Sequence, residues 1–290
     1  MKHSSLPQAA LPFLAAIITV IAAPQMPLAQ LAPAAKPVQL ASHRAVYDLT
    51  LDTTGAGSNV SDIRGQLIYD FSGSECQGFT LNTRLITEIF DRDGKPSTTD
   101  IRSESQEDAE GRRFKFNTSQ YVNDKLSETT KGVAIRSARS HDIVNVELEK
   151  PRRGMLTLSG NIYFPTQHSL AILKAALSGQ TRIQADIYDG SEKGTKVYET
   201  TTAIGAPLEL AANHDLPVVK NSEVLDEIQS WPVVVSYYDQ SPNKDGLPAY
   251  EVSFRMYANG VSRKLKLDYG TFSLNGELSA IEFLKTKPCP

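Results

Sequence analysis

The sequence predicts an all-β protein in which one large, mainly antiparallel sheet curls on itself and carries a single inserted helix. Two patterns lead to this class. Many segments alternate apolar and polar residues, and turn-forming Asn-Gly and Asp-Gly dipeptides separate them. A third observation gives the helix, because one segment has its apolar residues at helical spacing. The expected organisation is a signal peptide over residues 1–34 and a single domain over residues 35–290.

The first expected strand shows the alternation on which the others are also based. His43, Ala45 and Tyr47 fall on one face of this strand, whereas Arg44 and Asp48 fall on the other. Such a strand packs on a core with its apolar face and meets water with its polar face. Roughly 14 strands are expected in all. The clearest further segments are residues 65–71, 79–90, 113–121, 143–148, 183–188, 197–204, 233–238, 250–257, 265–269 and 278–284.

Turn dipeptides between these segments indicate antiparallel hairpins. Asn-Gly and Asp-Gly supply the positive φ angles that tight hairpin turns require. These dipeptides are Asp93-Gly94, Asp189-Gly190, Asp245-Gly246, Asn259-Gly260 and Asn275-Gly276. The acidic stretch 104–110 is interpreted as a solvated hairpin tip, and the basic run 150–153 as a solvated turn. The basic run could alternatively meet an acidic partner or lipid headgroups.

The inserted helix is expected at about residues 166–178. Thr166 can cap its N-terminus, and Gly179 sits where a glycine commonly ends a helix. The apolar face of the helix carries Leu170, Leu173 and Leu177. A second, short helix is expected near residues 223–228, inside a long excursion over residues 207–230. The sheet must curl, because so many strands left flat would expose edges and an apolar face.

The N-terminus predicts export. A short basic start precedes the uncharged run 11–23, which has the length of a signal-peptide core and is too short for a comfortable membrane span. Cleavage is expected between residues 22 and 35, and the alternative is an uncleaved anchor. No later stretch is long and apolar enough to span a membrane, so the mature chain is expected to be soluble. The net charge of −3 excludes a strongly basic protein that coats nucleic acid.

Cys76 and Cys289 are the only two cysteines. An even count in an exported chain suggests one disulfide, because that compartment is oxidising. The bond would hold a C-terminal tail that would otherwise fray. The alternative is two unrelated free thiols. Because there is no Cys-x-x-Cys motif, neither a redox active site nor a zinc ribbon is supported.

A search for catalytic and cofactor motifs finds none. The histidines show no metal-binding spacing, and neither a Gly-x-Ser-x-Gly elbow nor a phosphate-binding P-loop is present. The stretch 91–94 faintly resembles a calcium loop, but Lys95 sits where an oxygen ligand is needed, so a hairpin turn is preferred. The sequence therefore predicts a non-enzymatic protein with no metal, nucleotide or other cofactor.

Five residues are candidates for structural or partner-contact roles: His43, Arg44, Tyr47, His168 and Trp231. His43 shares the apolar face of its strand and is interpreted as a hydrogen-bonded structural histidine. Arg44 points the other way and can pair with a carboxylate. Trp231, the only tryptophan, begins a strand and either fills the core or lines an apolar cavity.

Several short motifs, in order along nearly the whole mature chain, resemble the alphaproteobacterial cell envelope integrity protein B (EipB) family of periplasmic proteins. The set is specific through its order, because each motif alone is weak. The motifs are His43-Arg44-Ala45-Val46-Tyr47, Cys76-Gln77-Gly78-Phe79, Phe164-Pro165-Thr166-Gln167-His168, Trp231-Pro232-Val233, Tyr250-Glu251-Val252-Ser253-Phe254, Asn259-Gly260-Val261-Ser262, Leu267-Asp268-Tyr269-Gly270 and Cys289.

The resemblance implies a many-stranded β-spiral, which is a broken barrel with a cup-like cavity, and a disulfide between Cys76 and Cys289. It also implies a role in envelope integrity under cell-wall stress and a periplasmic tetratricopeptide-repeat partner. It brings no enzymatic activity, catalytic residue or cofactor.

Three functions stay open at this point. The first is a non-catalytic periplasmic protein that supports the envelope through protein–protein contact. The second is a carrier that holds a lipid or lipoprotein inside the curled sheet. The third, ranked last, is a hydrolase whose site is assembled from residues far apart in the sequence.

Overall fold

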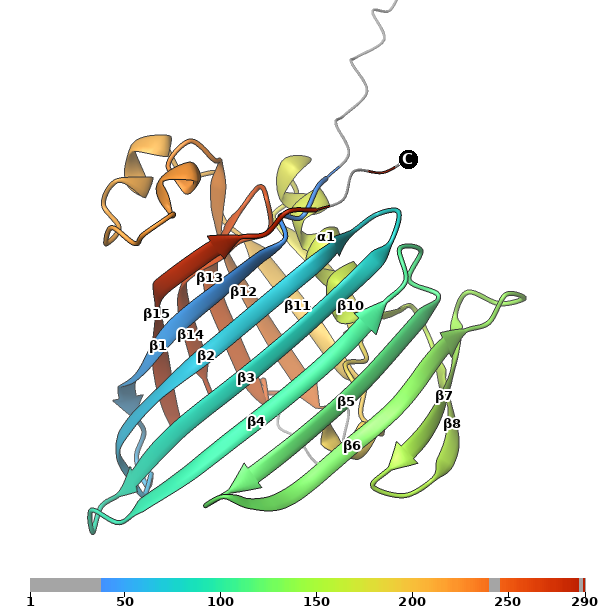
Figure 1. Cartoon of the computed structure of the whole chain (residues 1–290), viewed down its shortest axis with the longest axis horizontal. Helices are drawn as coiled ribbons and strands as arrows, with labels where there is room; N and C mark the ends of the chain where they lie inside the picture. Colours follow the sequence, from blue (N-terminus) through green and yellow to red (C-terminus); the bar gives the residue numbers. More distant parts are fainter. Residues whose placement is uncertain (1–37, 240–245, 287–288, 290) are drawn as a thin grey trace, which may run out of the picture. The chain divides into compact units, whose positions relative to one another are not determined.

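The fold is a single large sheet with one helix, which confirms the predicted all-β class (Figure 1). A computed structural model describes residues 38–239, 246–286 and 289, so the predicted signal peptide lies outside the described residues. The strands are β1 (His43–Thr54), β2 (Val60–Ser74), β3 (Gly78–Asp91), β4 (Pro96–Glu107), β5 (Arg113–Val122), β6 (Lys125–Arg136), β7 (Ile143–Lys150), β8 (Gly154–Ser159), β9 (Ile162–Tyr163), β10 (Arg182–Ile187), β11 (Tyr198–Ile204), β12 (Ser230–Asp239), β13 (Tyr250–Tyr257), β14 (Ser262–Asp268) and β15 (Phe272–Phe283). The helices are α1 (Pro165–Leu177) and three short 3-10 helices, η1 (Glu192–Gly194), η2 (Leu210–Asn213) and η3 (Glu223–Leu225).

The strand order makes the first and last strands neighbours inside the sheet. The order is β8-β7-β6-β5-β4-β3-β2-β1-β15-β14-β13-β12-β11-β10-β9. The described pairs are antiparallel except for β9 with β10, which is parallel. In Figure 1, β2 to β8 form one wall of the sheet, β10 to β14 form the wall behind it, and α1 lies between them at one end. The sheet is therefore nearly closed and barrel-like, and its end strands are β8 and β9.

The alternation predicted for the first strand sets the inner face of the sheet. His43, Ala45 and Tyr47 are buried, whereas Arg44 and Asp48 are exposed. The register continues this face across the neighbouring strands, since His43 lies opposite Phe71 on β2 and Phe283 on β15. Burying one such large apolar side chain contributes about 1.5–3 kcal/mol.

Apolar burial is concentrated in three clusters that together join the two walls and α1. The first, around β1 and β15, holds Ala45, Tyr47, Leu49, Val219, Leu225, Tyr257, Val261, Leu278 and Ile281. The second, around β5 to β7, holds Phe114, Phe116, Ala134, Val144, Val146, Leu148, Ile162, Phe164 and Tyr188. The third packs α1 against β11 to β13 through Ile172, Leu173, Ala175, Ala176, Ile204, Trp231, Val233, Val235 and Met256.

The start of α1 differs from the prediction. Thr166 was expected to cap the helix, but Phe164 occupies the N-cap position and makes no side-chain cap. The free N–H groups are instead met by the carboxylate of Glu107 at the end of β4. Its oxygens accept hydrogen bonds from the backbone N–H of Thr166 at 2.5 Å and of Gln167 at 3.3 Å. A negative group at a helix N-terminus satisfies unpaired donors and favours the helix dipole. The predicted C-terminal glycine is confirmed, since Gly179 has φ 74°.

Burial raises the pKa of Glu107 to about 7, although the hydrogen bonds from Thr166 and Gln167 oppose this shift. The folded protein then binds a proton at this site over a pH range in which the unfolded chain, with an ordinary glutamate pKa, does not. This contribution to stability is full below about pH 4.5 and is lost as the pH rises through about 7.

Glu107→Gln is expected to remove this pH dependence, because glutamine stays neutral at every pH. Between pH 5 and pH 8 the wild type should lose about 3 kcal/mol of unfolding free energy relative to the variant. The measurement is urea unfolding of both proteins across that range, and other titrating groups cancel in the difference. Parallel stability curves for the two proteins would contradict the assignment.

Four strands were not predicted: β4, β6, β8 and β9. The inner face of β4 is largely polar, with Ser97, Thr99, Ser103 and Ser105, so it lacks the alternation by which strands were recognised. Its backbone is held by a ladder to β3 along its whole length and by a ladder to β5 from Thr99 to Glu107. The acidic stretch 104–110 was wrongly interpreted as a hairpin tip, because its first four residues belong to β4 and Glu107 is buried.

The turn at Asn275-Gly276 was also predicted wrongly, whereas those at Asp93-Gly94 and Asn259-Gly260 join strands as expected. Gly276 lies inside β15, opposite Leu49 and Leu265, and an added Cβ would lie 3.0 Å from side-chain atoms of each. Glycine is therefore required for close packing there. Asp189-Gly190 lies in the loop between β10 and η1, and Asp245 lies outside the described residues. The short helix expected at 223–228 is the shorter η3.

Candidate functional site

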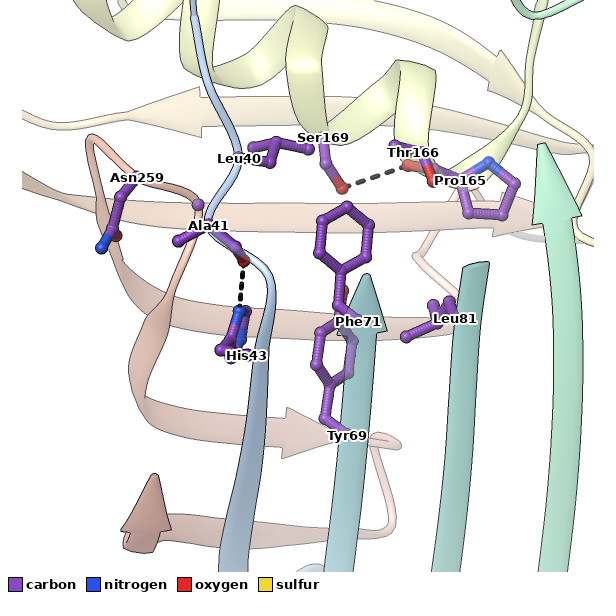
Figure 2. A pocket seen from close by; sticks show the side chains of 11 residues that line it. Leu40, Ala41, His43, Tyr69, Phe71, Leu81, Pro165, Thr166, Ser169 and Asn259 are labelled. Atoms are coloured by element: carbon purple, nitrogen blue, oxygen red, sulfur yellow. Dashed lines mark hydrogen bonds between the residues drawn. The ribbon is translucent and has the colours of Figure 1, made fainter. Parts of the chain in front are cut away.

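The candidate site is the inner face of the sheet at the end covered by α1. A small pocket lies there beneath the start of the helix, with a cavity volume of about 50 Å³ (Figure 2). Its lining residues are Leu40, Ala41, His43, Tyr69, Phe71, Leu81, Pro165, Thr166, Ser169, Asn259 and Gly260. Sites for drug-sized ligands usually measure about 300–1,000 Å³, so this pocket has room for a few water molecules rather than for a large ligand.

His43 is the histidine of this pocket, and its contacts are structural. Figure 2 shows its ring hydrogen-bonded to the backbone carbonyl of Ala41, with Nδ1 2.7 Å from the oxygen. The ring stacks on Tyr69, with 5.6 Å between ring centroids. Burial lowers the pKa of His43, against the opposing effects of the Ala41 carbonyl and Asp70. A neutral ring that donates Nδ1–H to the carbonyl fits this environment.

The neighbouring motif residues lie on opposite faces of β1. Arg44 points outward, 3.9 Å from the carboxylate of Asp70, and its side chain is 51% exposed. Such an exposed pair contributes little to stability. Tyr47 is buried and donates its hydroxyl to the Ser262 carbonyl at 2.8 Å, and burial raises its pKa. These two residues therefore do not form one site.

His168 and Trp231 are both buried, and both belong to the packing of α1. His168 on α1 meets Tyr163 edge to face, with 6.5 Å between ring centroids. Its Nε2 has no hydrogen-bond partner within the described part of the chain, and burial lowers its pKa to about 4. Trp231 on β12 lies in the third cluster with Leu173 of α1. Of the two positions considered for Trp231, the structure thus shows the one in the core.

Glu107 and Arg136 are the polar residues of this end that sequence reasoning missed. The Arg136 guanidinium donates to the carbonyls of Gly111, His141 and Ile162, and it lies 5.3 Å from the Phe164 ring. It thereby ties β6 to the chain just before α1. No local pattern could have found either residue, because the partners of Glu107 and two of the three carbonyl partners of Arg136 lie 25 or more residues away in the sequence.

Glu107 and His43, two titratable residues at this end, are both hydrogen-bonded to backbone groups. The Glu107 oxygens are engaged by helix N–H groups, and His43 is engaged by a backbone carbonyl. Among residues 38–239, 246–286 and 289, no cluster of His, Cys, Asp or Glu could hold a metal ion. In the same ranges, none of the helices has the length and apolar character needed to cross a membrane.

Away from α1, the inner face carries apolar side chains that are only half-buried. Leu67, Leu85 and Ile101 follow the buried Tyr47 in one row across β1 to β4, so they share its face. Each of the three is nevertheless partly exposed to solvent. The inner face along this row is therefore less completely buried than the residues under α1.

An aromatic cluster continues this inner face on β11 to β15. Tyr237 and Tyr250 stack with 4.3 Å between ring centroids, and Tyr198 meets both rings edge to face. Tyr269 and Phe272 extend the cluster. Burial raises the pKa of Tyr237 and of Tyr250, so both hydroxyls stay protonated.

The two cysteines lie at the same end of the sheet as α1. Cys76 is in the turn between β2 and β3, and it is bonded to Cys289 with 5.7 Å between their Cα atoms, a separation usual for disulfides. The segment after β15 also pairs with the chain before β1, because the Leu284 N–H donates to the Ser42 carbonyl at 2.8 Å.

Comparisons with known proteins agree on one family. The family described as EipB-like matches residues 34–285. Cell envelope integrity protein EipB of Brucella abortus (strain 2308) is 36% identical over 257 residues, which cover 88% of each chain. The crystal structure of a beta-barrel-like protein of a domain of unknown function, also from Brucella abortus, is similar with a TM-score of 0.76 and 32% identity. That match covers 86% of this chain and 100% of the other. The resemblance seen in the sequence motifs is thus confirmed.

Proposed function

The chain belongs to the EipB-like family, and on this premise we propose that it is an exported, non-catalytic protein that maintains cell envelope integrity by binding a partner protein. The observation that carries the proposal is the match over nearly the whole chain to a relative named for envelope integrity. Neither the family description nor the name of that relative states a catalytic activity.

The proposal includes export to the periplasm. It is supported by the signal-like residues 1–34 and by the bonded pair Cys76–Cys289, since disulfides persist in oxidising compartments. The mature chain would begin between residues 22 and 35 and would carry the whole sheet.

The function is tested by deleting the gene in the organism that encodes it. Loss of the protein should increase sensitivity to a detergent such as deoxycholate and to a β-lactam that inhibits wall synthesis. The full chain should restore resistance, whereas a chain without residues 2–34 should not. Unchanged resistance in the deletion strain would contradict the envelope role, and rescue by the leaderless chain would contradict export.

The proposed partner is a periplasmic tetratricopeptide-repeat protein, as the family resemblance implies. Purified mature protein should bind such a protein from the same organism at micromolar concentration and moderate salt. Isothermal calorimetry with the purified proteins measures this directly. If none of the candidate repeat proteins binds at those concentrations, the partner proposal fails.

A second candidate function is carriage of a lipid or lipoprotein. It is favoured by the half-buried apolar side chains on the inner face beyond α1, because such a surface suits an acyl chain. The small pocket under α1 has too little volume to serve this purpose.

Carriage is tested by mass spectrometry of organic extracts from gently purified protein. Lipid should be released from the wild type and lost in Leu85→Glu, which places a charge on the inner face. Ile86→Glu is the matched control, because Ile86 is similarly half-buried and its side chain lies on the outer face of the same strand. Extracts that contain no lipid, or equal lipid from the two variants, would rule the carrier out.

A further inference from the structure

The end strand β8 has one edge that no other strand covers. Its ladder to β7 runs from Leu148 opposite Gly154 to Ile143 opposite Ser159. Within the described part of the chain, no backbone hydrogen bond joins β8 to any element other than β7. In an antiparallel pair, every second residue directs its N–H and C=O away from its partner. β8 therefore offers a row of unpaired backbone groups.

This edge lacks the usual protection against strand pairing. Exposed edges are commonly blunted by charged residues or proline within the strand. The strand reads Gly-Met-Leu-Thr-Leu-Ser and contains neither. Met155 on it is 73% exposed, which is high for a large apolar side chain. The free edge lies at the right of Figure 1, where the β7–β8 hairpin ends the front wall.

A groove runs beside the first half of β8. It has a volume of about 430 Å³, and its lining comes from the β7–β8 hairpin and from residues 193 and 195 in the η1 region. Apolar lining comes from Leu148, Pro151, Met155 and Leu156, and the other lining residues are Arg152, Arg153, Gly154, Lys193 and Thr195. The groove thus combines an apolar surface with a free strand edge, which is the arrangement used to bind an extended peptide.

The charge of the groove is positive. Its lining includes Arg152, Arg153 and Lys193 and no acidic residue. The nearby carboxylate of Glu149 is paired with Lys131 at 2.5 Å. Lys131 lowers the pKa of Glu149 more than Arg153 does, so Arg153 is not neutralised by this carboxylate. Glu192 precedes Lys193 in the chain, is exposed and does not line the groove. The groove therefore favours an occupant with negative charge.

We propose that an extended, acidic segment of a partner protein pairs with β8 and lies in this groove. Its backbone fills the open edge, its apolar side chains lie on the face of β8 that carries Met155, and its carboxylates meet Arg152, Arg153 and Lys193. The inference rests on the proposed protein-binding function and names the face that carries it. An anionic membrane would satisfy the cations, but it would leave the backbone groups of β8 unpaired.

The test uses fluorescence anisotropy with a labelled synthetic peptide of about ten residues that alternates valine and glutamate. Wild-type protein should bind it at least about tenfold more tightly than it binds a valine–lysine peptide or the acidic peptide with a central proline. Arg152→Glu with Arg153→Glu should weaken binding by at least about tenfold. The matched control replaces Arg112 and Arg113 with glutamate. These residues are an exposed arginine pair at another hairpin, so this variant should bind the peptide as the wild type does. Hydrogen exchange at residues 154–159 should slow when the acidic peptide binds.

Three results would overturn the proposal. The first is no binding of the acidic peptide up to about 1 mM. The second is equal weakening by the two arginine-pair variants. The third combines absence of peptide binding with binding to vesicles of phosphatidylglycerol and phosphatidylcholine. In that case wild-type protein would sediment with the vesicles and the Arg152/Arg153 variant would not. The groove would then be assigned to a lipid surface.

Rescue of the deletion strain separates this inference from the proposed function. If the gene carrying Arg152→Glu and Arg153→Glu restores detergent resistance fully, the β8 face is not the docking surface and the envelope role stands. If the wild-type gene itself has no effect on resistance, the proposed function fails.

Discussion

Replacing Trp231 with alanine is expected to lower the free energy of unfolding by about 3–5 kcal/mol. The indole is 4% exposed and lies in the cluster that packs α1 against the sheet, together with Leu173 and Met256. Truncation to alanine removes a large buried apolar surface and leaves a cavity between helix and sheet, and both effects destabilise the folded state. α1 covers one end of the sheet, so its loss of support should be visible as faster hydrogen exchange in residues 165–177.

The measurement is guanidinium unfolding followed by far-ultraviolet circular dichroism. Tryptophan fluorescence cannot be used, because Trp231 is the only tryptophan in the chain. Trp231→Phe, which keeps an aromatic ring, should cost less than the alanine variant. Val218→Ala is the surface control, since Val218 is 90% exposed and should change stability by no more than about 0.5 kcal/mol. A loss below about 1 kcal/mol in Trp231→Ala would contradict the packing role.

Replacing Cys289 with serine is expected to destabilise the protein by up to about 5 kcal/mol. The bond between Cys76 and Cys289 spans 213 residues, so it restricts the unfolded chain over most of its length. In the folded state the segment after β15 stays in place without the disulfide, because the Leu284 N–H still donates to the Ser42 carbonyl. The unfolding midpoint of the wild type should fall on addition of reductant, and that of the variant should not change.

Alkylation under non-reducing conditions, read by mass spectrometry, checks the bond itself. Wild-type protein should take up no label without reductant, whereas Cys289→Ser should be labelled at Cys76. The double variant with both cysteines replaced should match the single variant in stability. Labelling of both thiols in unreduced wild-type protein would show that no disulfide forms.

The sequence predicts this fold wherever burial follows alternation along one strand. β1 and β7 were recognised in this way, because their apolar residues repeat at every second position and are buried. β4 was missed because its inner face is largely hydroxylic and depends on ladders to both neighbours. At Gly276 a local turn signal was overridden by packing, since the glycine there makes room for Leu49 and Leu265.

The polar contacts of the α1 end could be predicted less well. The burial of His43 follows from its place in the alternation of the first strand. The role of Glu107 does not, because its helix partner lies 59 residues further along the chain. An acidic residue among other acidic residues is normally solvated. The local composition therefore predicts an exposed side chain, whereas Glu107 is buried. Only the three-dimensional arrangement of β4 and α1 places that carboxylate at the helix start.

The pairing of β1 with β15 constrains when the molecule can finish folding. β2 to β8 are each joined to the next by short connections, so that wall can form by successive local hairpins. β1 and β15 are separated by more than two hundred residues, and their ladder must wait until the final strand has left the ribosome. A chain that cannot complete its sheet during synthesis stays open for longer. The position of the last strand beside the first thus delays closure of the sheet until the whole chain has been synthesised.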